Sequence, residues 1–348
     1  VYIRLQLQES PAFIEVKSAG RLSTAPLREA FGQWGNLKVV LLALFGATAG
    51  QAVVWYGGQF YALFFLEKTL MVDGASANIL IAVALAIGTP FFVLFGWLSD
   101  RVGRKPIILA GCALAALTYF PAFHALTEAA NPALARAQGA APVQVIAAPG
   151  DCSVQFDPIG KNSFDAKSCD IAKAFLARSG VSYTSVEAPA GAVAIVRIGA
   201  RSFTAPDPAA VTGAARKAAI AAYQSEVKAA LAAAGYPDKA DPAAIDTPVV
   251  IAILTWLVLL VTMVYGPIAA LLVELFPTRI RYTAMSLPYH LGNGWFGGFL
   301  PTTAFAIVAA TGDVYAGLWY PIIICGVTVA VGLAFLPETS RRRIDDGA

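Results

Sequence analysis

Long apolar runs, separated by short charged segments, dominate the chain. Six uncharged and mostly apolar stretches occupy residues 39–66, 75–99, 106–127, 247–273, 282–312 and 314–337. Each exceeds the ~20 residues that an α-helix needs to cross a ~30 Å hydrocarbon core. The sequence lacks the strict apolar/polar alternation of a membrane β-barrel. Because only helices and closed barrels satisfy the backbone in lipid, the pattern predicts six transmembrane helices.

Positive charge gathers on one side of these spans. Six helices would bring together the segments that hold Arg4, Lys17, Arg21, Arg28, Lys38, Arg101, Arg104, Lys105, Arg279, Arg281, Arg341, Arg342 and Arg343. On the other side, the loop at 67–74 holds only Lys68 and the turn at 312–314 holds no basic residue. The positive-inside rule therefore predicts cytoplasmic termini, comprising residues 1–38 and the tail 338–348. We expect a multi-pass protein of the plasma membrane, which is the inner membrane in a bacterium.

Residues 128–246 interrupt the apolar pattern between the spans of 39–127 and those of 247–337. They hold 11 Lys+Arg and 11 Asp+Glu, with no long apolar run. This predicts a small soluble α+β domain on the periplasmic or extracellular side, since long translocated segments escape the charge rule. Strands are expected at Val143–Ala147, Ser182–Val186 and Ala192–Ile198. Helices are expected from Ser168, as N-cap, to Gly180 and from about Pro208 to Ala234.

The overall composition excludes several classes of function. Of the 348 residues 57% are hydrophobic and 14% charged, whereas soluble domains carry about a quarter charged residues. A net charge of +3 gives no basic excess for nucleic acid, and two histidines with four scattered cysteines predict no metal site. The sequence shows no nucleophile–base set and no phosphate-binding loop, so we expect no enzyme activity and no cofactor.

Two of the four cysteines, Cys152 and Cys169, lie within residues 128–246. A structural disulfide is one interpretation; an oxidising compartment permits it, and loop closure would give it roughly 3 kcal/mol. A reactive thiol is the alternative, because Cys169 would lie in a first helical turn, where the dipole lowers a thiol pKa. Cys112 and Cys325, in separate spans, are expected to be packing residues.

Polar residues recur at helical spacing in the first and fifth spans. Ser286, His290, Asn293 and Gly297 share one helix face, as do Gln51, Trp55 and Gln59. Gln51 and Asn293 each lie roughly 18 Å along a helix from its charged end, so the two polar stripes are predicted to meet near mid-membrane. The candidate substrate-path residues are Gln51, Trp55, Tyr56, Gln59, His290 and Asn293.

These residues also have structural interpretations. Gln and Asn can serve as interhelical hydrogen-bond partners, and Trp and Tyr near the outer end, Tyr61 above all, suit an interfacial belt. His290, the ionisable residue inside a span, can be a neutral hydrogen-bonded imidazole instead of a substrate or proton group. The pairs Gly46/Gly50 and Gly294/Gly298 are expected to allow close helix packing.

Residues 96–109 read GWLSDRVGRKPIIL, a tight basic turn between two spans. Its glycines permit a sharp turn, and Asp100 can pair with Arg104 or accept hydrogen bonds from a helix N-terminus. The segment resembles the G-x-L-S-D-R-x-G-R-K signature loop of the major facilitator superfamily. The resemblance implies a conformational latch, formed in one access state and broken in the other, made by Gly96, Asp100, Arg101, Gly103, Arg104 and Lys105.

Two further loops carry a similar resemblance. The stretch ELFPTRIRYTA from Glu274 resembles the E-x-F-P-T-x-x-R loop of sugar porters and metabolite:proton symporters, and Pro337-Glu338-Thr339 resembles their closing P-E-T. Residues 55–66 (WYGGQFYALFFL) and 4–13 (RLQLQESPAF) are more similar to the metabolite:proton symporters, which carry organic acids, betaines or proline. Gln51 is followed by Ala52, so the glutamine pair of sugar porters is absent.

Glu274, Arg279 and Arg281 are expected to form a charged gate at the cytoplasmic mouth. The alternative is an exposed ion network that contributes little free energy.

The resemblance also predicts the place of this chain in a larger fold. The superfamily has twelve helices in two halves, and residues 4–13 resemble the loop that joins the halves. We therefore expect an all-α membrane fold, the C-terminal six-helix half, with the α+β domain inserted. Its partners would be the N-terminal six-helix half, the lipid bilayer, a small-molecule substrate and a proton. The resemblance implies proton-coupled symport by alternating access.

A different class of function is also consistent with the sequence. In that alternative the protein is a membrane-anchored sensor or binding protein, and residues 128–246 are its working part.

Overall fold

The structure, a computed structural model, describes residues 9–159, 161–210 and 212–341. Within these residues, six helices are long and apolar enough to cross a membrane: Trp34–Thr69, Gly74–Val102, Arg104–Ala130, Thr247–Leu275, Arg281–Thr311 and Ala316–Phe335. They coincide with the six apolar stretches, so the predicted spans are confirmed. Arg4, Arg342 and Arg343, part of the predicted charge bias, lie outside the described residues.

The spans are built from the following elements. The first comprises α4 (Trp34–Ala43), η1 (Leu44–Thr48), α5 (Ala49–Tyr56), η2 (Gly57–Tyr61), α6 (Ala62–Phe64) and η3 (Phe65–Thr69). The second and third are α7 (Gly74–Val102) and α8 (Arg104–Ala130). The fourth is α12 (Thr247–Tyr265) with α13 (Ile268–Leu275). The fifth joins α14 (Arg281–Leu291), η6 (Gly292–Gly297) and α15 (Leu300–Thr311), and the sixth joins η7 (Ala316–Leu318) and α16 (Trp319–Phe335).

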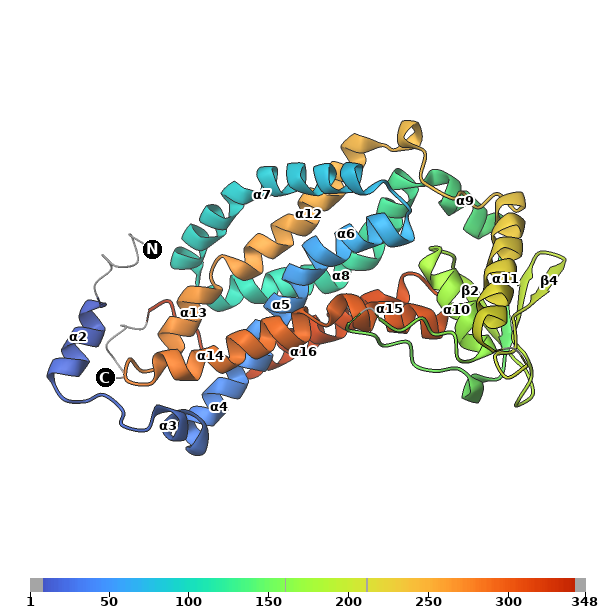
Figure 1. Ribbon diagram of the computed structural model, residues 1–348. Coiled ribbons are helices and arrows are strands. Elements are labelled where there is room, and N and C mark those ends of the chain that lie inside the picture. The colour runs from blue at the N-terminus through green and yellow to red at the C-terminus, as the bar shows by residue number, and fades with distance from the viewer. Residues whose placement is uncertain (1–8, 160, 211, 342–348) are drawn as a thin grey trace.

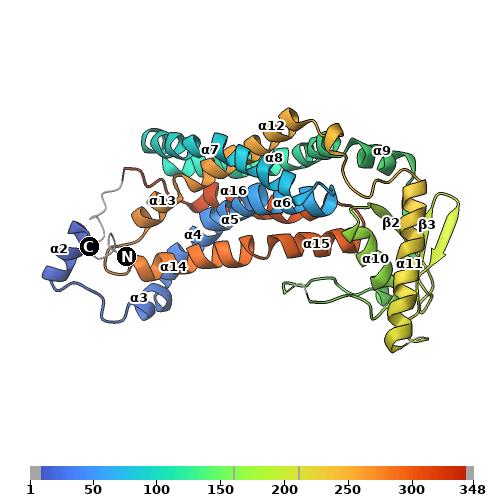
Figure 2. The ribbon, with the colours of Figure 1, turned by 45° about the horizontal axis from the view of Figure 1, so that its top comes forward.

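The spans lie alongside one another and separate two ends of the molecule (Figures 1 and 2). The turn between α13 and α14 lies at one end, termed the loop end, beside α2 (Pro11–Ser18) and α3 (Pro26–Gly32). The helices and strands of residues 131–246 lie at the opposite end, termed the insert end.

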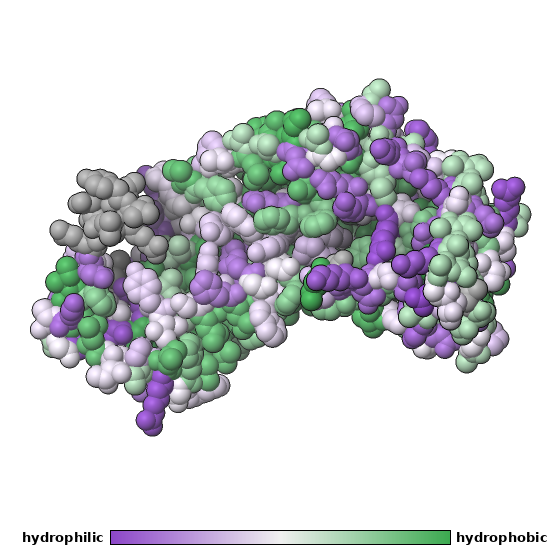
Figure 3. All heavy atoms as spheres, in the orientation of Figure 1, coloured by the Kyte–Doolittle hydropathy of each residue, from purple (hydrophilic) through white to green (hydrophobic). Residues whose placement is uncertain are grey.

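Apolar side chains on the outside of the bundle fit a lipid environment. On α7, Ile79, Val93 and Trp97 are exposed, and hydrophobic residues gather along this helix in Figure 3. Hydrophilic residues gather over the insert end in the same view. A soluble protein rarely exposes such an apolar face, whereas a membrane span does. The chain is therefore a multi-pass membrane protein.

Glycines and π-helical turns bring the first and fifth spans together. η1, η2 and η3 are π-helical turns in the first span, and η6 is one in the fifth. A Cβ on Gly297 would overlap the Tyr56 ring, and one on Gly292 would lie 3.1 Å from the carbonyl oxygen of Thr48. The close helix packing expected at Gly294 and Gly298 does not occur among the described residues: a Cβ on Gly294 would meet none of their atoms within 4 Å, and one on Gly298 would meet the Gly294 carbonyl oxygen of its own helix. At Gly46 the first span does approach another helix closely, as expected: a Cβ on Gly46 would lie 3.5 Å from Gly332 Cα of the sixth span.

Residues 131–246 form a four-stranded sheet with helices. The strands are β1 (Val143–Ala147), β2 (Tyr183–Glu187), β3 (Ile195–Ile198) and β4 (Arg201–Thr204), in the order β2-β1-β3-β4. β1 pairs parallel to β2 and antiparallel to β3, which pairs antiparallel to β4. The helices are α9 (Pro132–Ala140), η4 (Pro149–Asp151), α10 (Ser168–Arg178), α11 (Gly213–Ala233) and η5 (Pro242–Ala244).

Several expected boundaries in this segment shift. β1 has the predicted bounds, whereas α10 is N-capped at Lys167, so Ser168 is its first residue and its hydroxyl accepts from the Ala194 N–H. α11 begins at Gly213 rather than near Pro208. β4 is not predicted by the sequence, because this short strand is mostly polar and exposed and it forms only through its pairing with β3 after the Gly199 turn. A disulfide joins Cys152 to Cys169, which lies in the first turn of α10.

Hydrogen bonds attach this segment to the ends of the spans. The Tyr183 N–H donates to the Gly312 carbonyl at 2.7 Å, and Lys173 Nζ donates to the Ala310 carbonyl at 3.3 Å. The Ala240 N–H donates to the Met71 carbonyl at 3.0 Å. One hydrophobic core continues from Leu257 in the bundle to Val145 in the sheet. Residues 131–246 are therefore packed against the helix bundle and are not joined to it by linkers alone.

Candidate functional site

The turn between α7 and α8 is built around Gly103 and Arg104. Gly103 has a φ of +111°, which a residue with a side chain rarely adopts, so the chain reverses sharply here. Arg104 forms an ion pair with Asp100, one helical turn earlier, and donates from Nη1 to the Ser99 hydroxyl at 2.8 Å. Ser99 in turn donates to the Gly96 carbonyl at 2.6 Å. These contacts order the latch loop predicted from the sequence.

Arg104 also reaches the last turn of α13. Its Nη2 and Nε donate to Glu274 Oε1 at 3.2 and 3.4 Å, and both side chains are 11% exposed. Glu274 Oε2 accepts from the buried Thr339 hydroxyl at 2.6 Å. Both charged groups of this partly buried pair are hydrogen-bonded, which offsets the free-energy cost of removing them from water.

The segment after the sixth span closes the same cluster. Glu338 accepts from the backbone N–H of Arg104 at 2.9 Å and of Lys105 at 3.1 Å, so its carboxylate lies at the N-terminus of α8. Lys105 Nζ donates to the Leu336 carbonyl at 2.8 Å. Burial by itself raises the pKa of Glu338, but hydrogen bonds from Ser340, Arg104 and Thr339 outweigh it and hold this pKa below its usual value.

Three loops far apart in the sequence thus form one cluster at the loop end of the bundle. We term it the loop-end network; its members are Ser99, Asp100, Arg104, Lys105, Glu274, Glu338 and Thr339. The sequence predicts each loop separately but does not predict that Glu338 and Thr339 contact the other two. The P-E-T stretch was the signal that pointed to them.

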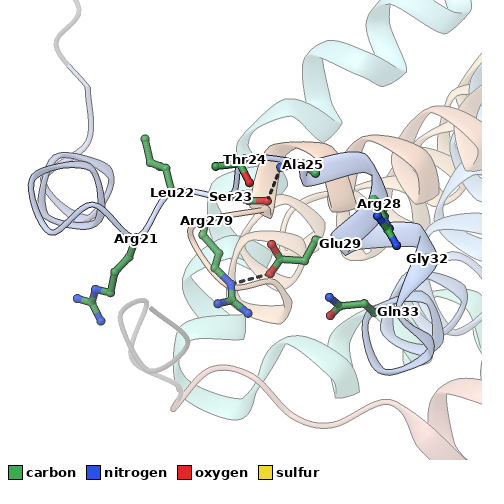
Figure 4. A pocket seen from close by; sticks show the side chains of 10 residues that line it. All are labelled: Arg21, Leu22, Ser23, Thr24, Ala25, Arg28, Glu29, Gly32, Gln33 and Arg279. Carbon is green, nitrogen blue, oxygen red and sulfur yellow. Dashed lines mark hydrogen bonds and ion pairs between the residues drawn. The ribbon is translucent and has the colours of Figure 1, made fainter.

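The other expected gate residues have different partners. Arg279 Nε pairs with Glu29 of α3 at 2.8 Å rather than with Glu274, and Figure 4 shows the two side chains pointing toward each other. Arg281 Nε donates to the Phe276 carbonyl at 3.0 Å and is buried. Arg101, which was expected in the latch rather than in the gate, stacks over the Trp97 ring, 4.0 Å from its centroid. The predicted gate is therefore divided between the loop-end network and α3.

The pair of Arg279 and Glu29 borders an open polar pocket of about 530 Å³ at the loop end. Its lining residues are Arg21, Leu22, Ser23, Thr24, Ala25, Arg28, Glu29, Gly32, Gln33 and Arg279. Figure 4 shows the Arg21 side chain pointing away from this pair. Glu29 had no signal in the sequence analysis, because the approach of α3 to the α13–α14 turn is a tertiary contact.

The two polar stripes meet between α5 and η6. Gln51 Nε2 donates to Asn293 Oδ1 at 3.4 Å, and Asn293 Nδ2 donates to the Tyr289 carbonyl at 2.9 Å. Gln51 is fully buried, and its Oε1 has no hydrogen-bond partner among the described residues. Such an unpaired buried acceptor costs roughly 1–3 kcal/mol, so its presence needs a reason. The Thr48 hydroxyl also links the first and fifth spans, because it donates a hydrogen bond to the Pro288 carbonyl at 2.9 Å.

Aromatic side chains lie along the first span beside this pair. Trp55 stacks on Tyr265 with ring centroids 4.2 Å apart, and Tyr265 exchanges a hydrogen bond with Tyr289. Tyr56 packs on Phe60, and Gln59 is half-buried in η2 with no hydrogen bond among the described residues. Trp55 thus lies between the first, second and fourth spans rather than on the Gln51–Asn293 seam.

The two histidines lie in different surroundings. His290 is exposed on α14, where its ring contacts Tyr289, and it donates to no other helix among the described residues. The neutral, interhelically hydrogen-bonded imidazole considered above therefore has no partner in the described part of the chain. His124, which the sequence analysis did not single out, stacks on Tyr315 with ring centroids 3.7 Å apart near the insert end. No group of three or more His, Cys, Asp or Glu side chains among the described residues could hold a metal ion.

Comparisons with known proteins agree with the loop motifs. A family model described as sugar (and other) transporter matches residues 4–147 and 209–346. It therefore includes residues 128–147 and 209–246 and leaves 148–208 unmatched, a narrower gap than the predicted insert.

Two curated relatives match shorter parts. A "Putative proline/betaine transporter" of Staphylococcus aureus (strain MSSA476) is 27% identical over 116 residues, which is 32% of this chain and 23% of the relative. The citrate-proton symporter of Klebsiella pneumoniae is 34% identical over 79 residues, 22% of this chain and 18% of the relative. The matched part thus spans less than a quarter of either relative.

No solved structure matches the chain significantly. The family match nevertheless covers well over half of the chain, and the relatives are transporters rather than enzymes. The chain therefore belongs to the sugar (and other) transporter family, within the major facilitator superfamily.

Proposed function

We propose that this chain forms the C-terminal half of a secondary active transporter that moves a small polar metabolite together with a proton. The observation that carries the proposal is the loop-end network, in which three loops of the six-helix bundle meet on Arg104 and Glu274. The relatives named as proline/betaine and citrate-proton transporters support a zwitterion or an organic acid as substrate.

In this proposal the loop-end network is the latch of an alternating-access cycle. Its ion pairs join α7, α8, the end of α13 and the segment after α16, so these elements move as one body while the contacts last. Breaking the pair between Arg104 and Glu274 frees the α7–α8 turn from α13. The contacts of the loop-end network are present in this structure, and in this proposal they belong to one of the two access states.

The Gln51–Asn293 pair is the proposed wall of the substrate path. A buried amide oxygen without a donor is suited to accept a hydrogen bond from an ammonium, hydroxyl or protonated carboxyl group of a substrate. Exposed His290, one turn from Asn293, is the proposed proton-responsive group on the same helix. An N-terminal six-helix half would supply the facing wall of the path.

The proposed topology places the loop end in the cytoplasm and residues 128–246 outside it, as a small α+β domain in the periplasm or the extracellular space. The basic residues of the α7–α8 and α13–α14 turns favour this orientation. The proposed membrane is the plasma membrane, or the inner membrane in a bacterium.

The test is uptake by cells that express the native protein, whose intact mass shows whether further helices accompany this chain. Uptake of labelled proline, glycine betaine and citrate is measured with and without an uncoupler. We expect one compound to accumulate, and the uncoupler to abolish its accumulation. The Asp100→Asn variant should lower uptake at least about tenfold with normal membrane insertion, because Arg104 loses one of its two carboxylate partners.

Asp238→Asn is the matched control, since Asp238 pairs with Lys228 on the surface of residues 128–246. It should leave uptake unchanged. Normal uptake by Asp100→Asn would refute the latch. A native protein that transports none of the three compounds but binds a ligand through residues 128–246 would favour the sensor alternative.

A further inference from the structure

A cavity of about 760 Å³ lies at the insert end, far from the proposed substrate path. One wall is the outer end of the first span, with Tyr61, Phe64 and Lys68, and a second is α15, with Phe305. The third wall comes from residues 155, 157 and 161–164 and from Arg178 of α10. Figure 2 shows the long loop before α10 extending back along α15. Tyr61 lies ten residues beyond Gln51, about 15 Å along a helix, so this cavity is separate from the Gln51–Asn293 pair.

The third wall of the cavity is formed by a segment that the family model does not match. Residues 148–208 have no counterpart in the family model, and they supply both the 155–164 loop and α10. The cavity therefore exists only because this unmatched segment packs on the membrane helices. Its volume lies within the range of about 300–1,000 Å³ that is typical of small-molecule sites.

The charges around the cavity favour an anion. Lys68, Lys161 and Arg178 line it, against a single carboxylate, that of Asp157. Asp157 is occupied within its own loop, where it accepts from the backbone N–H of Asn162 at 2.6 Å and of Ile159 at 3.2 Å. In the described part of the chain, Lys68 and Lys161 have neither a hydrogen bond nor an ion pair, and Arg178 donates only to the Asn162 carbonyl at 3.2 Å.

The rest of the lining favours an apolar body attached to that anion. Tyr61, Phe64, Phe65, Phe164 and Phe305 provide aromatic surface below the charged rim. Phe65 and Phe164 are buried, and the ring of Phe65 packs edge-on against that of Phe123, which fixes the floor. Apolar surface with a few convergent charged groups is the usual composition of a site for an amphiphilic ligand.

We infer that this cavity is a binding site for an organic anion with an aromatic or hydrocarbon body and a carboxylate or phosphate group. The anionic group lies among Lys68, Lys161 and Arg178, and the apolar body lies against Phe64 and Phe305. The ligand would contact the first span, α15 and the unmatched segment at once. The same chemistry is found in soluble organic acids and in anionic lipids, which the test separates. The inference does not depend on which compound the protein transports.

The test is equilibrium dialysis of the purified protein in phosphatidylcholine nanodiscs with 2-naphthoate, and with neutral 2-naphthamide as the uncharged counterpart. We expect naphthoate to bind at least about tenfold more tightly than naphthamide, since a charge-assisted contact contributes on the order of one such factor. The double variant Lys161→Gln/Arg178→Gln should lose this preference. Arg201→Gln/Lys217→Gln removes two exposed charges of residues 131–246 that lie outside the cavity, and this variant should bind as wild type.

A second variant keeps the test decisive if the double variant misfolds. Lys68→Gln alters only an exposed side chain at the end of the first span and should also weaken naphthoate binding. Equal binding of naphthoate and naphthamide, or wild-type affinity in both cavity variants, would overturn the inference. Repeating the titration in phosphatidylglycerol nanodiscs assigns the source: weaker naphthoate binding identifies an anionic lipid as occupant, and unchanged binding identifies a soluble organic acid. Because the readout is binding and not uptake, a failed transport assay leaves this result intact.

Discussion

Single side chains show how differently the same residue type can be placed in this protein. Gln51 and Gln59 lie on one predicted helix face, yet Gln51 is fully buried beside Asn293 and Gln59 is half-buried with no hydrogen bond among the described residues. Arg104 and Arg279 occur in similar basic loops, yet Arg104 has two carboxylate partners and Arg279 is paired with α3. Residue type and spacing predicted that the stripes of Gln51 and Asn293 meet, but they did not predict the partner of Arg279.

Gln51 offers a test that separates transport from stability. Gln51→Leu removes a buried oxygen that has no donor, which favours folding, and also the long hydrogen bond to Asn293, which opposes it. Because the two effects offset each other, we expect the free energy of unfolding to stay within about 1 kcal/mol of wild type. Proton-gradient-dependent uptake should nevertheless fall at least about tenfold, since the substrate loses a hydrogen-bond partner. The measurement pairs melting of the purified protein with uptake in cells.

Thr328→Val is the matched control for Gln51→Leu. Thr328 is also fully buried, and its hydroxyl oxygen also has no hydrogen-bond partner among the described residues. Its uptake should equal that of wild type. If Gln51→Leu transports as well as Thr328→Val, Gln51 is a packing residue.

Glu338 makes the loop-end network sensitive to acid. Its pKa is lowered in the folded protein, so its contribution to stability is fully present above the usual Glu value of about 4.3. That contribution is lost as the pH falls through the lowered value, because a protonated carboxyl no longer holds the N–H groups of Arg104 and Lys105 as strongly. We expect wild type to melt at a higher temperature than Glu338→Gln above pH 5, and the difference to vanish toward pH 3.

The control for this pH profile is Glu226→Gln, which removes an exposed carboxylate of α11 that has no ion pair in the described part of the chain. A melting-temperature difference between wild type and Glu338→Gln that stays constant from pH 3 to pH 6 would contradict the assignment.

At the scale of elements, the disulfide and the backbone contacts of residues 131–246 decide how firmly this segment is held. Cys152 precedes a long irregular loop and Cys169 lies in the first turn of α10, so their bond fixes the loop that forms one cavity wall. Burial lowers the pKa of Lys173, and the nearby Asp170 carboxylate offsets part of this effect. Lys173 still donates to the end of α15, which anchors α10 to the bundle.

Removing the disulfide should lower the local stability of residues 131–246 without changing that of the membrane spans. Loop closure over 17 residues corresponds to roughly 3 kcal/mol, so Cys152→Ser/Cys169→Ser should speed hydrogen exchange in β1 and α10 but not in α12. Thiol labelling followed by mass analysis checks the bond itself. Both cysteines should react only after reduction, while the buried Cys112 and Cys325 stay unlabelled in the folded protein. Labelling of Cys152 and Cys169 without a reductant would exclude the bond.

At the scale of the whole molecule, the two ends of the bundle have different chemistry. The loop end carries the loop-end network and the pair of Arg279 and Glu29, while the insert end carries the amphiphilic cavity. Both arise where segments distant in the sequence meet: residues 99–105, 274 and 338–339 at one end, and residues 61–68, 155–178 and 301–308 at the other. The bundle between them brings these segments to the same ends.

The sequence by itself determined the six spans, because a run of about 20 apolar residues has no stable alternative to a helix in lipid. It also determined β1 and most of α10, whose hydrophobic periodicity is local, and it indicated the family through three short loops. Only the tertiary structure decided that Glu338 caps α8 and that Arg279 binds Glu29. It also decided that Gly292 and Gly297, rather than Gly294, form the helix seam, and that β4 exists. Those features depend on which segments approach in space, and local patterns of hydrophobicity and charge carry no record of that approach.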